Sequence, residues 1–415
     1  MTTEIDYNHL IQPDKVHGSL YTSDEIYADE LEKIFHKSWV YVGHESEIKE
    51  RGDYLVREIG RSSVIMVRDK DGSIKVHANR CMHRGNMLCN EAEGNKRNFT
   101  CPYHGWVFGL DGTLMDVAYP GGFEKPLAEL GLQTLVSDSY RGFVFASFVQ
   151  PELSFDDYLG NAKSLIDRSC EMSPTGKIDL RGGWVRQHFD ANWKMLPEND
   201  TDGYHVNYVH QSFVMAIDSQ YGEFVGAEDS IQGVIKDWGN GHTEIDFSAG
   251  YAKTLDWLGS TPEKVKSYVD SMREAYGQEK ADKILYAGPP HACIFPNLFL
   301  GEMNIVIFQP TGTNSAVQWS TPMFLDGAPE LDFKLLRQSE GALGPAAFLL
   351  ADDASIAERA QIALLSGDPW CDLSRGLNRE TSDKDGVITS HMTDETSNRG
   401  FWFWFHYRDV MTGVK

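Results

Sequence analysis

The chain has 415 residues, more than one average hydrophobic core accommodates, so its length predicts two domains. It carries 61 Asp and Glu residues against 38 Lys and Arg residues, which gives a formal charge of −23. Nucleic-acid-binding proteins typically have a basic surface, so this charge argues against that class.

No apolar run approaches the length of a membrane span, and the N-terminus is polar and acidic, so we expect a cytoplasmic protein. Six cysteines in a long chain without a secretory signal do not indicate a disulfide framework. We expect two of them, Cys81 and Cys101, to bind a metal and the other four to be small buried side chains.

The first 38 residues are predicted to be largely helical, with a helix that begins near Ser23 and has apolar residues at helical spacing. From Trp39 to about residue 150 the pattern changes to β-strands. Two Asp-Gly pairs, at 71–72 and 111–112, are typical of hairpin turns between such strands. This stretch is therefore predicted to be an all-β domain.

Residues 151–158 mark a domain boundary, after which a helix over 155–170 and a strand near 180–190 are predicted. Residues 260–285 have the pattern of one solvated helix. Residues 293–312 and 315–325 are predicted to be paired strands of a core sheet, and 328–365 to return to helix. The tail, with six aromatic residues within 401–407, is predicted to be a buried closing element.

A pair of short motifs in the β-rich domain carries the metal chemistry. Cys81 and His83 form a C-x-H pair, and Cys101 and His104 form a C-x-x-H pair, with seventeen residues between the pairs. In a Rieske [2Fe–2S] centre two histidines replace two cysteines on one iron. A zinc site is the alternative, but zinc fingers use C-x₂₋₄-C and H-x₃₋₅-H pairs, and this spacing differs from both.

The motif C-x-H-x₁₇-C-x-x-H, with Arg84-Gly85 after the first pair and Gly105-Trp106 after the second, resembles the Rieske motif of the large (alpha) subunits of aromatic ring-hydroxylating oxygenases. The resemblance implies an α+β fold. An all-β Rieske domain would span 39–154, and residues 1–38 and 155–415 would form a catalytic domain with an antiparallel sheet surrounded by helices, of the helix-grip type. It also implies that Cys81 and Cys101 bind one iron of the cluster while His83 and His104 bind the other.

A second candidate metal site follows downstream, where Asp202, His205 and His210 stand as D-x-x-H-x₄-H. Five residues of regular helix would place the two histidines roughly 140° apart, so the segment must be distorted by a π-bulge or a break. Gly203 favours such a distortion. Two histidines and one carboxylate are the ligands of non-haem Fe(II) oxygenases, and both Asp202 and Asp353 are candidates for that carboxylate.

The resemblance selects Asp353, in GPAAFLLADD, as the third ligand in preference to Asp352, and Glu358 is a further nearby acid. It gives Asp202 a different role, as a bridge between a mononuclear-site histidine and a cluster histidine of the neighbouring subunit, which implies a homotrimeric core. Glu198 and Asn199 are candidates for lining the pocket.

The resemblance implies a terminal oxygenase component that dihydroxylates or hydroxylates an aromatic ring, with a substituted benzoate as the expected substrate class. Its cofactors would be one [2Fe–2S] cluster and one Fe(II) per subunit. No dinucleotide-binding G-x-G-x-x-G follows a strand, so electrons are expected from a separate ferredoxin or reductase. A small beta subunit is a further possible partner. A monooxygenase or demethylase of the same fold, and a non-enzymatic zinc protein, are the alternatives.

Overall fold

The computed structural model describes residues 5–212, 232–343, 348–396 and 403–413. The chain forms two compact units. Unit 1 comprises Met1–Glu30 and Asp156–Lys415, and unit 2 comprises Leu31–Phe155. None of the described helices is long and apolar enough to cross a membrane.

Unit 2 begins eight residues before the expected start of the β domain. The predicted N-terminal helix changes character, since its α-helical part ends at Glu30 and a π-helix follows at Leu31–Phe35. Ile34 and Phe35 are fully buried, and the backbone oxygen of His36 accepts a hydrogen bond from Ser147 Oγ. These contacts tie residues 31–38 to the β-strands of unit 2.

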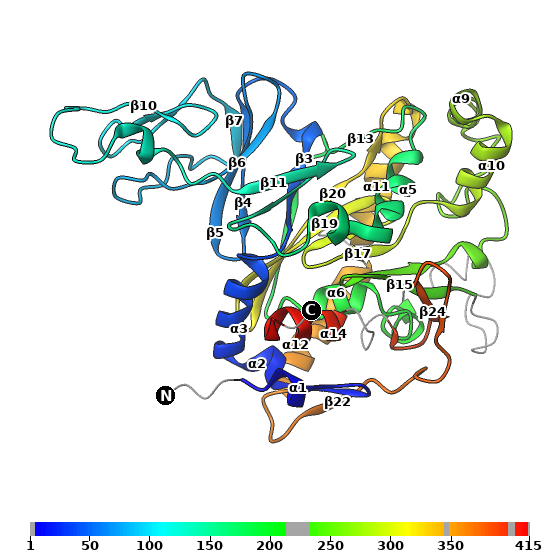
Figure 1. Cartoon of the computed structure of the whole chain (residues 1–415). Coiled ribbons are helices and arrows are strands. Elements are labelled where there is room, and N and C mark those ends of the chain that lie inside the picture. The colour runs from blue at the N-terminus through cyan, green and yellow to red at the C-terminus, as the bar shows by residue number, and fades with distance from the viewer. Residues whose placement is uncertain (1–4, 213–231, 344–347, 397–402, 414–415) are drawn as a thin grey trace. The chain divides into compact units, whose positions relative to one another are not determined.

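Unit 2 contains three small antiparallel sheets, with strand orders β11-β12-β3, β6-β5-β4-β7 and β10-β9-β8 (Figure 1). The two predicted Asp-Gly hairpins are present, and Gly72 and Gly112 both have the positive φ that such turns require. The strands are β3 Val40–His44, β4 Asp53–Ile59, β5 Ser62–Arg68, β6 Ile74–Ala78, β7 Glu93–Asn95, β8 Phe99–Thr100, β9 Val107–Phe108, β10 Leu114–Asp116, β11 Val136–Tyr140 and β12 Phe143–Ser147.

Unit 1 is built on a nine-stranded antiparallel sheet of order β14-β20-β19-β18-β17-β16-β15-β24-β23. Its strands are β14 Val185–Phe189, β15 Val234–Gly239, β16 His242–Asp246, β17 Ala292–Ile294, β18 Leu298–Leu300, β19 Asn304–Gly312, β20 Ser315–Pro322, β23 Thr381–Ser382 and β24 Ile388–His391. Five short strands of the part of unit 1 that the structure describes lie outside this sheet: β1 Ile11–Gln12, β2 Lys15–His17, β13 Ile178–Asp179, β21 Phe324–Leu325 and β22 Trp370–Asp372.

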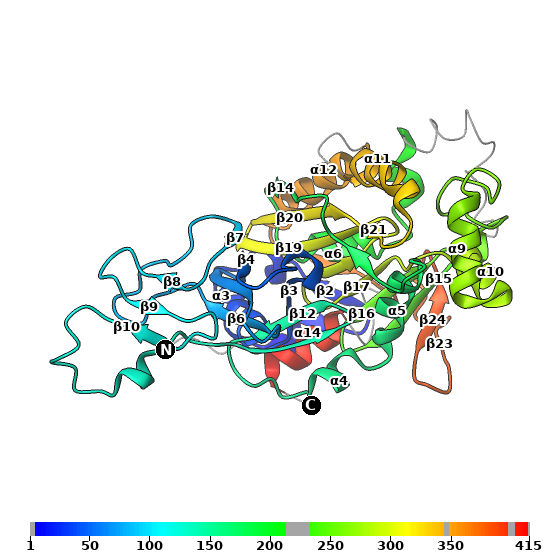
Figure 2. The same cartoon turned by 90° about the horizontal axis from the view of Figure 1, so that it is seen from above.

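Helices cover both faces of the large sheet (Figure 2). Helix α5 covers one face, because its Arg168 pairs with Glu244 of β16. The neighbouring residue of β16, Thr243, points to the opposite face, since side chains alternate along a strand. Helices α6, α11 and α12 pack against β17, β20 and β14 respectively. The α-helices in the described ranges are α1 Tyr7–Leu10, α2 Ser19–Thr22, α3 Asp24–Glu30, α4 Phe155–Leu159, α5 Lys163–Glu171, α6 Met195–Asp200, α7 Val206–Val209, α9 Lys266–Tyr276, α10 Gln278–Ala287, α11 Asp332–Leu343, α12 Phe348–Ala363 and α14 Phe403–Thr412.

The structure differs from the sequence expectation in residues 260–285 and agrees with it in the aromatic tail. The single helix expected over 260–285 is wrong: the structure has two helices, α9 and α10, broken at Gly277, whose φ of 76° lies outside the helical region. The aromatic tail forms α14, in which Trp404 and Tyr407 are fully buried, as expected of a closing element. Phe401 and Trp402 lie outside the described residues. The α+β fold class, which combines an all-β unit with a unit built on an antiparallel sheet surrounded by helices, is confirmed.

Two candidate metal centres

The two Cys-His loops of unit 2 share one backbone design. In each loop the cysteine N–H donates to the carbonyl five residues later (Cys81 to Asn86, Cys101 to Trp106) at 2.8 Å. The glycine four residues after each cysteine donates back to the cysteine carbonyl at 3.0 Å. Gly85 and Gly105 both have a φ of 72°, which only glycine adopts at little cost. The same loop is therefore built twice, with the histidine two residues after the cysteine in one copy and three in the other.

The four side chains separate into a buried cysteine pair and a more accessible histidine pair, in which His83 is exposed and His104 is half-buried. Cys81 and Cys101 are each 1% exposed, and the Cys101 thiol hydrogen-bonds that of Cys81. Burial raises the pKa of Cys81, the backbone N–H groups of His83 and Arg84 lower it, and the Cys101 thiol raises it again. The Nδ1 atoms of His83 and His104 lie 3.1 Å apart. Two adjacent sulfurs inside and two adjacent imidazoles outside are a donor set that fits a two-iron cluster with unlike irons.

Trp106 supports the exposed end of this donor set. Its ring stacks on His83 with 6° between the planes and 5.0 Å between centroids. Trp106 is itself 3% exposed and belongs to the hydrophobic core beneath both cysteines. The stacking fixes the direction of the His83 ring, as partners of ligating imidazoles commonly do.

The D-x-x-H-x₄-H segment of unit 1 contains a break, one of the two distortions expected. Helix α6 ends at Asp200, and the chain leaves helical geometry at Thr201 (φ −115°, ψ 18°). The next helix, α7, is a single turn, with His205 at its beginning and His210 at its end. Glycine at position 203 lets the chain at this break pack closely against Met392, because a Cβ there would lie 2.3 Å from the carbonyl oxygen of Met392.

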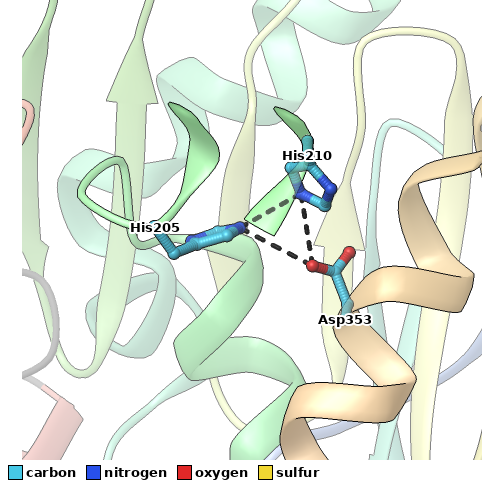
Figure 3. Close-up of side chains that lie close together, drawn as sticks. All are labelled: His205, His210 and Asp353. Carbon is cyan, nitrogen blue, oxygen red and sulfur yellow. Dashed lines mark hydrogen bonds and ion pairs between the residues drawn. The ribbon is translucent and has the colours of Figure 1, made fainter. Parts of the chain in front are cut away.

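His205, His210 and Asp353 point toward one another (Figure 3). The two Nε2 atoms are 3.2 Å apart, and Asp353 Oδ1 lies 3.2 Å from His210 Nε2 and 3.6 Å from His205 Nε2. Asp353 comes from α12, far along the chain from α7. Within the described part of the chain, this is the one group of three or more His, Cys, Asp or Glu residues whose ligand atoms all lie within 4.8 Å of one another.

This geometry fits a metal ion. Ligand atoms about 2.1 Å from one ion and at right angles to one another lie about 3 Å apart, close to the spacing observed here. Asp353 is 7% exposed, and its Oδ1 accepts no hydrogen bond from the described residues. A buried carboxylate oxygen without a donor is costly unless a cation meets it. Two imidazoles and one carboxylate on one side of an ion form the set typical of non-haem Fe(II) oxygenases.

Two further carboxylates face the outer nitrogens of the histidines. Asp202 Oδ2 lies 3.3 Å from His205 Nδ1, and Asp352 Oδ2 lies 3.7 Å from His210 Nδ1. Each carboxylate favours a proton on Nδ1 and thereby leaves Nε2 free to bind a metal. Asp352 and Asp202 are thus placed beside the triad, and neither contributes one of its three converging atoms.

The surroundings of the triad are strongly negative. Burial would lower the pKa of His205, but the hydrogen bond and charge of Asp202, with the charges of Asp353 and Asp200, raise it. An arrangement that favours a proton on an imidazole also favours a metal cation in its place. Asp200 was not predicted at this position, and Asp352, which the sequence offered only as an alternative third ligand, faces the outer nitrogen of His210.

Two other residues near the site behave differently from the sequence expectation. His291, which no motif identified, donates from Nε2 to the carbonyl oxygen of Asp200 at 2.8 Å, and burial lowers its pKa to about 4, so it is neutral. Glu198, expected to line the pocket, instead accepts the Tyr21 hydroxyl at 2.9 and 3.0 Å. Glu198 therefore belongs to a separate polar cluster at the start of α6.

Comparison with protein families gives two matches, one in each unit. Residues 38–126 match the Rieske [2Fe-2S] domain, and residues 179–408 match the ring hydroxylating alpha subunit catalytic domain. The second match alone covers more than half of the chain.

Individual relatives agree with these matches. The chain is 32% identical to the large oxygenase component of salicylate 5-hydroxylase from a Ralstonia species, over 94% of this chain and 93% of the relative. It is 30% identical to the large subunit of anthranilate 1,2-dioxygenase from Acinetobacter baylyi, over 88% and 81%. Among solved structures, naphthalene 1,2-dioxygenase with indole bound in the active site superposes with a TM-score of 0.86 at 25% identity, covering 99% of this chain and 96% of the other.

The resemblance inferred from the spacing of the cysteines and histidines is thereby confirmed, and so are the cofactors expected from it. The chain belongs to the large (alpha) subunits of the ring-hydroxylating dioxygenase family, whose members carry a Rieske [2Fe–2S] cluster and a mononuclear iron.

Proposed function

We propose that this chain is a terminal oxygenase component that adds oxygen from O₂ to the ring of a small aromatic acid of the substituted-benzoate class. The observation that carries the proposal is the convergence of His205, His210 and Asp353 on one point inside unit 1, combined with the paired Cys-His loops of unit 2. One site collects electrons and the other supplies ligands for an oxygen-activating metal.

The proposal assigns a role to each candidate residue. Cys81 and Cys101 would hold one iron of the cluster, and His83 and His104 would hold the other. His205, His210 and Asp353 hold the mononuclear Fe(II), which supplies the one-electron chemistry that lets O₂ react with an aromatic ring. The protein contributes the fixed direction of both imidazoles, and the buried sheet face beside α6 limits access of water.

Asp202 has a second role in this proposal. One of its oxygens faces His205 and the other accepts the backbone N–H of Tyr204 at 2.6 Å, while the carboxylate remains partly exposed. We assign it as the bridge to a cluster histidine of a neighbouring subunit in a homotrimer. In that arrangement the exposed imidazole pair of one chain serves the iron site of the next.

The substrate class is supported by the relatives. Anthranilate, 2-halobenzoate and salicylate, named for three of them, are all benzoates with a substituent on the ring. Because the salicylate enzyme is named a hydroxylase and the other two are named dioxygenases, hydroxylation of the ring is the second candidate reaction.

A turnover experiment with isotopically labelled O₂ tests this proposal. The holoenzyme, supplied with a surrogate reductase, is offered a panel of substituted benzoates, with naphthalene and benzene as unsubstituted controls. We expect turnover of at least one benzoate, with both labelled atoms in a dihydrodiol or one in a hydroxylated product. Turnover of the hydrocarbons and of none of the acids would contradict the proposed substrate class.

Electrons are proposed to come from an acidic ferredoxin or reductase that docks near the cluster. Arg84, Lys96 and Arg97 are all exposed on unit 2 of this otherwise acidic chain. Opposite charges across a transient interface speed association more than they strengthen binding. These three cations would therefore act mainly on the rate of reduction.

Reversing the three charges, with Arg84→Glu, Lys96→Glu and Arg97→Glu together, is expected to slow reduction of the cluster about tenfold or more at low salt. Stopped-flow absorbance measures this rate. The matched control reverses three exposed lysines of unit 1, Lys266, Lys280 and Lys283, and is expected to reduce at the normal rate. An unchanged rate in the first variant would count against the docking surface.

A further inference from the structure

The triad forms only if two segments of unit 1, α6–α7 and α12, keep fixed positions relative to each other. Helix α6 leads through the break at Thr201 into the turn that carries His205 and His210, and α12 carries Asp353. Residues 201–205 contain no regular helix, so the position of the histidines depends on where α6 lies. The contacts at the beginning of α6 therefore matter for the metal site.

Gln361 joins the two segments directly. It lies on α12, two turns after Asp353, and is 4% exposed. Its Oε1 accepts the backbone N–H of Asn192, just before α6, at 2.9 Å, and its Nε2 donates to the carbonyl oxygen of Tyr21 at 3.1 Å. A single amide thus connects the ligand-bearing helix to the chain entering α6 and to the N-terminal segment.

A buried ion pair anchors the same end of α6. Lys194 is the N-cap residue of α6, its Nζ lies 2.5 Å from Glu30 Oε1, and both side chains are completely buried. The indole of Trp193 and the hydroxyl of Tyr407 also donate to Glu30, at 2.9 and 2.6 Å. Residues 193–194 are thereby tied to α3 and to the C-terminal helix α14.

Such a pair is a weak source of stability, because removing two charges from water offsets most of their attraction. Its geometry is strict, however, because every displaced partner would leave a buried charge or a buried polar atom without a hydrogen bond. The cluster formed by Gln361, Asn192, Glu30 and Lys194 consequently restricts α6 to one position relative to α12.

We infer that Gln361, together with the Glu30–Lys194 pair, positions the iron ligands, so that affinity for the mononuclear metal depends on these residues although none of them reaches the triad. The inference rests on the proposed function, in which His205, His210 and Asp353 hold the iron. Gln361 is a positioning residue in this scheme and takes no part in the chemistry.

The test is an anaerobic Fe(II) titration of the cluster-containing protein. Gln361→Met keeps the side-chain volume and removes both hydrogen bonds. We expect its Fe(II) dissociation constant to rise about tenfold or more, with an unchanged cluster spectrum. The matched control is Gln309→Met. Gln309 is another buried amide of unit 1, on β19, and its Oε1 accepts a hydrogen bond from Trp319 Nε1 at 2.7 Å. This variant should keep the normal Fe(II) affinity. Equal Fe(II) affinities in the two variants would overturn the inference.

A second variant covers the case in which Gln361→Met does not fold. The double change Glu30→Gln and Lys194→Met removes both charges, and the new amide keeps one oxygen to accept from the Trp193 indole while its NH₂ group can donate to the Tyr407 hydroxyl. We expect a folded protein with weakened Fe(II) binding, and normal Fe(II) binding would overturn the inference. His205→Ala separates the two proposals: if it leaves Fe(II) binding intact, the ligand assignment itself fails, whereas an effect of His205→Ala with none in the positioning variants refutes only the inference.

Discussion

Replacing His205 with alanine is expected to abolish turnover and binding of the mononuclear iron while the [2Fe–2S] absorbance persists. Its Nε2 supplies one of three atoms that converge within 3.2 to 3.6 Å, and two remaining ligands do not hold Fe(II) against water. The loss should exceed the roughly 10- to 100-fold effect of removing a residue that only supports a ligand. The iron content should fall from three to two irons per chain, while the content of acid-labile sulfide should stay at two per chain.

The control for this change is His188→Ala. His188 is an exposed histidine of the same unit, bonded to Ser315 Oγ at 3.0 Å, and its removal should leave iron content and turnover unchanged. Disappearance of the cluster spectrum in His205→Ala would show that the division of ligands between the two sites is wrong. Stoichiometric zinc in the unaltered protein, with no visible absorbance, would contradict both assignments.

Replacing Cys101 with serine is expected to eliminate the [2Fe–2S] cluster and every turnover that depends on the electron donor. The Cys101 sulfur is buried next to Cys81 and is held by a hydrogen-bonded loop, so no other thiolate can replace it without rebuilding that loop. Unit 1 has its own core and should still bind one Fe(II) per chain. Visible absorbance and Fe(II) titration measure the two outcomes.

Cys89 provides the matched control in the same unit. It is 2% exposed, and burial raises the pKa of its thiol to about 11, so it is a protonated packing residue. Cys89→Ala should therefore cost about 1 kcal/mol of stability through a small cavity and leave the cluster spectrum intact. If Cys89→Ala lost the cluster and Cys101→Ser kept it, the ligand assignment would have to be exchanged.

The cluster site could be predicted from sequence because it is local. Each Cys-His pair lies within one short loop, and the glycine that closes the loop, Gly85 or Gly105, follows the cysteine by four residues. Spacing and residue type therefore carry most of the information. The Asp-Gly turns are local in the same sense, because backbone preferences of a few residues decide them.

The mononuclear site could be predicted only in part, because its three side chains come from two segments far apart in the sequence. The helical period alone showed that one regular helix could not direct His205 and His210 to the same point, and it therefore predicted a distortion. It could not locate that distortion at Thr201 or show that Gly203 is needed for close approach to Met392. Similarly, the π-helix lies at Leu31–Phe35, where no pattern indicated one.

The sequence by itself thus determined the type of each metal centre and, through the motif spacing, the family. Residue type alone left Asp353, Asp352 and Asp202 equivalent as the third ligand, and the family resemblance favoured Asp353. Only the tertiary structure showed that packing of α12 against α6 and α7 brings an Asp353 oxygen to both Nε2 atoms and places Asp352 and Asp202 at the outer nitrogens. The same packing revealed the cluster around Gln361 and the Glu30–Lys194 pair. Its members come from three distant segments, and Tyr407, which donates to Glu30, comes from a fourth, so no sequence spacing could have brought them together.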